Sequence, residues 1–166
     1  GELRNLLISG RLAPGEKLSL RKVAEAVGVS MMPVREAISR LAADGALEVL
    51  PGRAVRVPIL SLDQFHELTR IRLVVEGYAA EEAARHADAE DLARIARHED
   101  AFREAASAEV LDPSVAIAAN RDFHFAVYRA SGMPSLVEMI ERLWLKAGPI
   151  LNLDLRGEPR RIRGGT

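Results

Sequence analysis

The sequence has no cysteine among its 166 residues. Disulfides, thiolate catalysis and cysteine-ligated zinc sites are therefore excluded, and the composition suits a reducing cytoplasm, where we expect the protein to act. Aromatic residues make up only 4% of the chain, and no apolar run approaches the roughly 20 residues that span a bilayer. No basic stretch followed by an apolar segment and a cleavage site opens the chain, so we expect no secretory signal.

The sequence motifs of common enzyme classes are also absent. The chain holds no HExxH, no nucleophile elbow, no GxGxxG and no phosphate-binding loop. Apolar residues nevertheless make up 48% and charged residues 28%, which is enough for both a core and a solvated surface. Alanine and leucine dominate the apolar set, and this balance favours packed helices over β-rich folds. We predict a mostly α-helical protein that is not an enzyme.

The small net charge of −1 hides a difference between two parts of the chain. Residues 1–58 carry a net charge of +3, whereas residues 59–166 carry −4. A segment that is more basic than the rest of its chain indicates an anionic partner for that segment.

Turn and capping residues divide the first 58 residues into three short helices and a hairpin. We expect helices over 3–9, from Ser19 to Gly28, and from Ser30 to Gly45. Residues 47–57, with the turn at Pro51 and Gly52, are predicted to form a β-hairpin. Three short helices followed by a hairpin make a winged helix-turn-helix, and we assign it to residues 1–58.

Longer helices follow Pro58. Capping signals predict helices over 61–85, 88–107, 112–131 and 134–147, the last ending before Gly148 and Pro149. In the helix over 61–85, the inward path takes either Ile71 or Arg72. Further along, it takes either Tyr78 or Ala79. In the helix over 88–107, Leu92, Ile95 and Phe102 are expected to point inward. We predict that residues 59–166 form an all-α antiparallel helical bundle that is incomplete at its C-terminus.

The segment from Leu18 to Gly45 is the most informative part of the sequence. Val34, Ile38 and Leu41 recur at helical spacing and predict the buried stripe of one helix. Val29 is expected to fill the core between this helix and the one before it. The opposite face then presents polar and thioether side chains, and a helix that enters the major groove by its N-terminal end reads bases with such a face.

This segment resembles the GntR family of bacterial transcription regulators. The family signature runs PG-x-x-L, then LA-x-x-x-GVS-x-x-PVREA-x-x-x-L-x-x-x-G. The chain shows Pro14, Gly15, Leu18, Val23, Ala24, Gly28, Val29, Ser30, Pro33, Val34, Arg35, Glu36, Ala37, Leu41 and Gly45. The hairpin at 47–57 matches the family's wing. The helical remainder resembles the effector-binding FCD domain of the FadR subfamily, through Arg72 to Glu76 and the stretch FHFAVYRASG at 123–132.

The resemblance implies which residues contact DNA. They lie at the start of the second helix, in the first turns of the recognition helix and at the wing tip: Arg21, Ser30, Met31, Met32, Arg35, Pro51, Gly52 and Arg53. The chain departs from the family at Met31, where members commonly carry arginine. Methionine cannot bind guanine bidentately, although it can pack against a thymine methyl group. Arg21 and Arg35 therefore carry more of the expected contact.

The resemblance also implies a ligand site in the helical domain, at Arg72, Glu76, Asn120 and His124. Asn120 and His124 are four residues apart, so they share one helix face, which suits a shared ligand or a divalent ion of the zinc or nickel type. A plain pocket histidine is the alternative for His124. Arg72 and Glu76 make either an ordinary surface ion pair or, as the resemblance implies, a group that meets the carboxylate of an effector.

These observations predict a homodimeric, DNA-binding transcription regulator, a repressor by resemblance. Its operator binding would be controlled by a small-molecule effector, an organic acid, through a population shift between two spacings of the paired recognition helices. Two alternatives stay open. One is a metal-responsive regulator in which the ion itself is the signal, and the other is a helical enzyme or dimerisation module that carries a helix-turn-helix.

Overall fold

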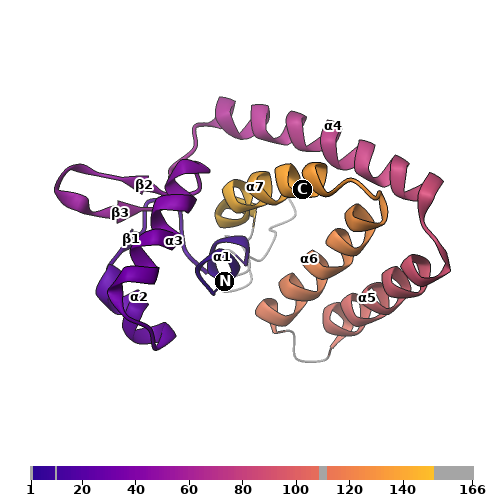
Figure 1. Cartoon of the computed structure of the whole chain (residues 1–166), viewed down its shortest axis with the longest axis horizontal. Coiled ribbons are helices and arrows are strands. Elements are labelled where there is room, and N and C mark those ends of the chain that lie inside the picture. Colours follow the sequence, from indigo (N-terminus) through magenta and orange to yellow (C-terminus); the bar gives the residue numbers. More distant parts are fainter. Residues whose placement is uncertain (1, 10, 109–111, 152–166) are drawn as a thin grey trace, which may run out of the picture.

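The computed structural model describes residues 2–9, 11–108 and 112–151. Helices dominate these residues, and a small antiparallel sheet lies near the N-terminal end (Figure 1). In chain order the elements are α1 (Glu2–Ile8), β1 (Lys17–Leu18), α2 (Leu20–Val27), α3 (Met31–Ala43), β2 (Glu48–Val49), η1 (Pro51–Arg53), β3 (Val55–Arg56), α4 (Leu62–His86), α5 (Ala89–Ser107), α6 (Pro113–Ala130) and α7 (Pro134–Leu151). This order confirms the predicted fold class, a winged helix-turn-helix followed by a helical bundle.

The helix-turn-helix forms where the capping residues predict it. The Oγ of Ser19 accepts a hydrogen bond from the backbone N–H of Lys22, which closes the start of α2. Gly28 ends α2 at φ 69°, a left-handed conformation that glycine adopts without steric cost. Val29, however, does not fill the core as expected. It is 43% exposed.

The sheet has one strand more than the sequence predicts. β3 lies between β1 and β2, and Val55 pairs with Leu18 on one side and with Val49 on the other. The turn at Pro51 and Gly52 predicts the hairpin of β2 and β3, whereas β1 is not predicted, because its pairing partner lies far along the chain in β3. The turn at Gly15 donates its N–H to the carbonyl oxygen of Val57 and so brings β1 alongside β3.

Capping boxes open α4 and α5, as the sequence predicts. Ser61 and Gln64 exchange side-chain and backbone hydrogen bonds, and Asp88 and Asp91 do the same. The inward path of α4 takes Arg72 and Ala79 rather than Ile71 and Tyr78, which are exposed. Leu92 was wrongly placed inward, since its side chain is 58% exposed on α5. None of the helices among the described residues is long and apolar enough to cross a membrane.

The last helix runs further than the sequence predicts. α7 continues through Gly148 and Pro149 to Leu151 instead of ending at Ala147. Gly148 packs directly on the backbone of α1, and a Cβ atom there would lie only 2.6 Å from the carbonyl oxygen of Leu7. Burial against α1 therefore overrides the usual tendency of a Gly-Pro pair to end a helix. Glycine is the residue type that permits this approach.

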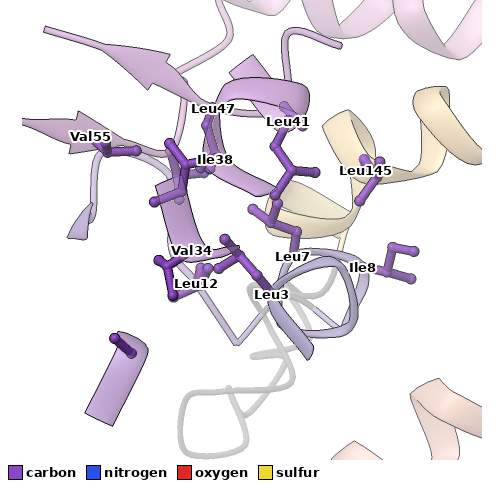
Figure 2. Packing of buried hydrophobic residues seen from close by; sticks show 13 residues of the cluster. Leu3, Leu7, Ile8, Leu12, Val34, Ile38, Leu41, Leu47, Val55 and Leu145 are labelled. Carbon is purple, nitrogen blue, oxygen red and sulfur yellow. The ribbon is translucent and has the colours of Figure 1, made fainter. Parts of the chain in front are cut away.

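The buried apolar residues form two clusters. The first, which we call the N-terminal core, lies among α1, α2, α3 and the sheet, and also takes in Leu145 of α7. Figure 2 shows Leu145 beside Leu7 and Leu41. The second, which we call the bundle core, consists of Ala79, Phe125, Tyr128 and Ile140. Because of Leu145, a helix of the bundle completes the core of the winged helix-turn-helix.

Candidate functional sites on the recognition helix and in the bundle

The first candidate site is the exposed face of α3. Val34, Ile38 and Leu41 are buried, as predicted, so the opposite side of the helix faces solvent. Met32 is 65% exposed there, and Arg35 is exposed one turn further along. This face carries one long apolar side chain and one guanidinium group, which suit the apolar and acceptor groups of a major groove.

Other residues expected to contact DNA lie on α2 and at the start of α3. Arg21 is exposed on α2, where its Nε lies 3.5 Å from a carboxylate oxygen of Glu25. Ser30 occupies the N-cap position of α3, but its side chain makes no capping hydrogen bond, which leaves the hydroxyl available to a partner. Met31 differs from Met32, because it is half-buried and packs against the N-terminal core. Less of its side chain is therefore available to DNA.

The wing lies between β2 and β3. Pro51 and Gly52 are exposed at its tip, and Gly52 has φ 80°. The Leu50 N–H donates to the carbonyl oxygen of Ala54 across the turn at 2.8 Å, which holds the tip in a defined shape. The side chain of Arg53 lies outside the described part of the chain.

The second candidate site is a cluster of polar side chains in the bundle, centred on Glu76 of α4. Arg72 Nε donates to Glu76 Oε1 at 2.6 Å, and only 18% and 16% of the two side chains are exposed. Tyr128 of α6 donates its hydroxyl to Oε2 at 2.6 Å, and Trp144 of α7 donates its Nε1–H to Oε1 at 3.1 Å. One carboxylate thus receives hydrogen bonds from three helices, so this is not an ordinary surface ion pair.

Aromatic rings enclose this cluster. The guanidinium carbon of Arg72 lies 5.3 Å from the centroid of the Trp144 ring, a distance typical of a cation–π contact. The His124 ring lies 5.4 Å from the Trp144 ring, and its Nδ1 is 3.3 Å from the Tyr128 hydroxyl oxygen. Rings that exclude water strengthen the interaction between Arg72 and Glu76.

Burial shifts two titratable groups of the cluster. Removal from water lowers the pKa of His124. The negative charge of Glu76 acts in the opposite direction, but its effect is smaller. The imidazole is therefore neutral at pH 7. Burial also raises the pKa of Tyr128, and the hydrogen bond to Glu76 adds to this effect. The Tyr128 hydroxyl therefore keeps its proton and acts as a donor.

The four residues predicted for the effector lie on two helices. Arg72 and Glu76 meet on α4, while His124 joins them through Tyr128 on α6. Asn120 is half-buried on α6, one turn before His124. Sequence reasoning missed Tyr128 and Trp144. Tyr128 lies four residues after His124 and so on its helix face, a spacing that could have revealed it.

A metal ion does not find a complete ligand set here. In the described ranges no three side chains of histidine, cysteine, aspartate or glutamate gather to hold an ion. Asn120 and His124 alone provide one neutral amide and one imidazole, which are too few for a closed site. A metal ion at this position stays a prediction that requires ligands from outside the described residues.

A separate groove of about 630 Å³ lies between the winged helix-turn-helix and α7. Its apolar lining includes Val23, Val27 and Val34, and none of the four residues predicted for the effector contributes to it. Two ion pairs cross at its edge, Arg4 with Glu141 and Arg142 with Asp44, at 3.6 and 3.4 Å. Both link the N-terminal part of the chain to α7.

Two family models match this chain. Residues 1–57 match the family described as bacterial regulatory proteins, gntR family, and residues 67–164 match the FCD domain. The chain belongs to the GntR family. It is thus a GntR-family transcription regulator with an FCD domain, as the sequence resemblance implied.

Relatives of this GntR-family chain are named transcriptional regulators. HTH-type transcriptional regulator McbR of Escherichia coli is 38% identical over 91% of this chain and 67% of its own length. A probable D-xylose utilization operon transcriptional repressor of Paenarthrobacter nicotinovorans is 34% identical over 87% of this chain and 63% of its own. These names confirm that the chain is a regulator and not an enzyme.

Solved structures support the same assignment. Escherichia coli McbR/YncC superposes with a TM-score of 0.87 at 36% identity, over 98% of this chain and 76% of that one. A GntR-type regulator from Rhodococcus sp. RHA1 superposes with a TM-score of 0.72 at 27% identity, over 99% of this chain and 76% of that one. The chain thus spans between 63% and 76% of the length of these relatives.

Proposed function

We propose that this GntR-family chain is a DNA-binding repressor controlled by a small-molecule effector. In this proposal residues 1–58 bind operator DNA, and residues 59–166 bind the effector. One observation carries the proposal: the same chain joins an exposed recognition-helix face to a shielded polar cluster at Arg72, Glu76 and His124. The first suits a nucleic acid, and the second suits a small ligand in a site shielded from water.

The DNA contacts divide into two kinds. Arg21 on α2, Ser30 at the N-cap of α3 and the wing tip suit contacts to phosphates that fix orientation. Arg35 and Met32 project from the recognition helix itself and suit base edges, the guanidinium with guanine and the thioether with a thymine methyl group.

Arg35→Ala tests the DNA-binding part of this proposal. Sequences bound by the protein are first selected from a library of random duplexes, and affinity for a selected duplex is then measured by fluorescence anisotropy at several salt concentrations. We expect Arg35→Ala to weaken binding by about 1–3 kcal/mol if the residue contacts a base. Arg97→Ala, which removes the same charge from the exposed surface of α5, is the matched control.

Two results would contradict the DNA-binding proposal. One is duplex binding that does not weaken as salt rises, because neutralised phosphates must release counterions. The other is an equal loss of affinity in Arg35→Ala and Arg97→Ala, which would mean that only net charge matters.

We propose a small organic acid as the effector. The guanidinium of Arg72 has a planar set of donors that matches a carboxylate bidentately. Glu76 already takes two of these donors, so an acid would have to share Arg72 with Glu76 or displace it. The neutral His124 ring and the Asn120 amide provide further hydrogen-bonding groups on the adjacent helix. Repression is supported by the name of the relative from P. nicotinovorans.

A thermal-shift experiment tests this ligand class. The probes are lactate, succinate and benzoate, with D-xylose as an uncharged comparison, each at millimolar concentration. A bound acid raises the melting temperature by mass action, and the shift should disappear in Arg72→Met. Stabilisation by D-xylose alone would replace the acid with an uncharged ligand, and equal shifts in wild type and Arg72→Met would place the ligand elsewhere.

We propose that the regulator acts as a homodimer. One recognition helix buries too little surface to give high specificity, and two helices about one turn of DNA apart read two half-sites. Sedimentation velocity of the full-length protein, alone and with a selected duplex, tests this proposal. A monomer in both conditions would overturn it.

A further inference from the structure

Trp144 is the only tryptophan of the chain and belongs to the polar cluster around Glu76. Its Nε1–H donates to Glu76 Oε1 at 3.1 Å, and the Arg72 guanidinium carbon lies over its ring. The ring also lies 5.3 Å from that of Phe125, edge to face. Trp144 therefore contacts both members of the part-buried ion pair and the bundle core.

The same side chain also packs against the N-terminal core. Among the described residues, Trp144 is the only partly buried side chain that packs against both apolar clusters. The next residue, Leu145, has no exposed surface and belongs to the N-terminal core. One turn after Trp144, Gly148 rests on the backbone of α1. A single turn of α7 thus joins the polar cluster to the core beneath the recognition helix.

This turn has little freedom to move independently of α1. The carbonyl oxygen of Ile8 lies 2.7 Å from the point where a Cβ atom at Gly148 would be, so any displacement of this turn towards α1 must move α1 as well. Protein interiors are packed densely enough to transmit such small displacements. Helix shifts of this kind, about 1–2 Å, are a common form of regulatory transition.

We propose that Trp144 is a positioning residue that couples the Arg72–Glu76 pair to the N-terminal core. The inference rests on the proposed ligand site, because it names how occupancy of that site reaches the DNA-binding part. A ligand that engages Glu76 or Arg72 takes away the acceptor of the Trp144 N–H or the cation above its ring. The indole must then reorient, because a shielded donor without an acceptor is costly. Leu145 and Gly148 carry this change to α1.

The coupling is tested without ligand or DNA, on the full chain. Glu76→Gln removes the charge of the carboxylate while keeping its size, and hydrogen exchange is measured at the backbone amides of α1. Amides of α5, which packs on α6, report any general loss of stability and serve as the reference. The same substitution is then made in the backgrounds Trp144→Phe and Tyr128→Phe.

Tyr128→Phe is the matched control because it also removes one hydrogen bond to Glu76, but from α6 instead of α7. We expect Glu76→Gln to speed α1 exchange relative to α5 in the wild-type and Tyr128→Phe backgrounds. We expect the ratio of the α1 to the α5 exchange rate to rise by a factor of about 2 to 30, which corresponds to the range of measured coupling energies. In the Trp144→Phe background the factor should fall to about 1.

An isosteric replacement covers the case in which Trp144→Phe does not fold. Because the chain has one tryptophan, growth on benzothienylalanine replaces only position 144, with a ring of similar size that lacks the N–H donor. It should abolish the coupling as Trp144→Phe does. An equal effect of Glu76→Gln in all backgrounds, or no effect in any, would overturn the proposal. Neither outcome bears on whether the protein binds DNA or an effector, which the experiments above measure separately.

Discussion

The two apolar clusters differ in what surrounds them. The N-terminal core consists of aliphatic side chains from α1, α2, α3, the sheet and α7. The bundle core is smaller and partly aromatic, and it borders a carboxylate, a guanidinium and an imidazole. An aliphatic core depends on shape and volume alone, whereas the second also depends on every hydrogen bond being made. A ligand can therefore change the second core far more easily than the first.

The largest loss of stability is expected at Leu145, the residue of α7 that belongs to the N-terminal core. Leu145→Ala removes a fully buried side chain and should lower the free energy of unfolding by about 2–5 kcal/mol, through lost transfer energy and a residual cavity. Urea unfolding followed by circular dichroism measures it. Leu92→Ala, at an exposed leucine of another helix, should change stability by less than about 0.5 kcal/mol. Similar losses in both variants would mean that α7 does not complete this core.

A somewhat smaller loss of stability is expected from breaking the part-buried ion pair of Arg72 and Glu76. Glu76→Ala leaves Arg72, Tyr128 and Trp144 without their common acceptor and should cost about 2–3 kcal/mol, below the range for fully buried pairs. Glu48→Ala is the comparison, because Glu48 pairs with Arg56 at the same 2.6 Å in a more exposed position. Its cost should stay below about 1 kcal/mol.

The pH dependence of stability should reveal the polar side of the bundle core. Burial lowers the pKa of His124 in the folded state, so between this pKa and the ordinary value of 6.5 the unfolded chain binds more protons. The contribution of neutral His124 to the free energy of unfolding is therefore fully present above pH 6.5. It is lost as the pH falls through this window. Melting temperatures are measured from pH 8 to pH 5. Below pH 6.5 the melting temperature should fall less for His124→Gln than for the wild type. The exposed His66→Gln is the control, and identical profiles for wild type and His124→Gln would contradict the prediction.

The smallest effect on stability is expected on the DNA-binding face. Arg21→Ala removes an exposed ion pair with Glu25 and should change the free energy of unfolding by no more than about 0.5 kcal/mol. If Arg21 contacts phosphate, the same variant should lower DNA affinity for all sequences alike and reduce its dependence on salt. A stability loss as large as that of Glu76→Ala would show that Arg21 supports the fold.

Local signals in the sequence predict most of the fold. Caps such as Ser61 with Gln64 depend on residues three positions apart, so the start of α4 is predicted correctly. The end of α7 is not, because what holds Gly148 in a helix is the backbone of α1, more than 130 residues earlier in the chain. The strand β1 was missed for a similar reason, since its pairing partner lies in β3.

The candidate site was predicted in part for the same physical reason. Arg72 with Glu76, and Asn120 with His124, lie at helical spacing and can be recognised within one helix. That Tyr128 and Trp144 converge on Glu76 depends on the packing of three helices, which no spacing in the sequence records. For Arg72 the partial burial of its pair with Glu76 argues against an ordinary surface ion pair, while contact with an effector stays a prediction.

The presence of Leu145 in the N-terminal core has a consequence for how the protein is made. A ribosome synthesises a chain from its N-terminus at about 5–20 residues per second. The winged helix-turn-helix is therefore made well before α7. Until roughly 90 further residues have followed Pro58, the side of α1 that packs on Leu145 and Gly148 has no cover. The nascent regulator therefore cannot complete its DNA-binding core until its bundle has been synthesised. A chain that ended before residue 145 would lack the side chain that completes this core.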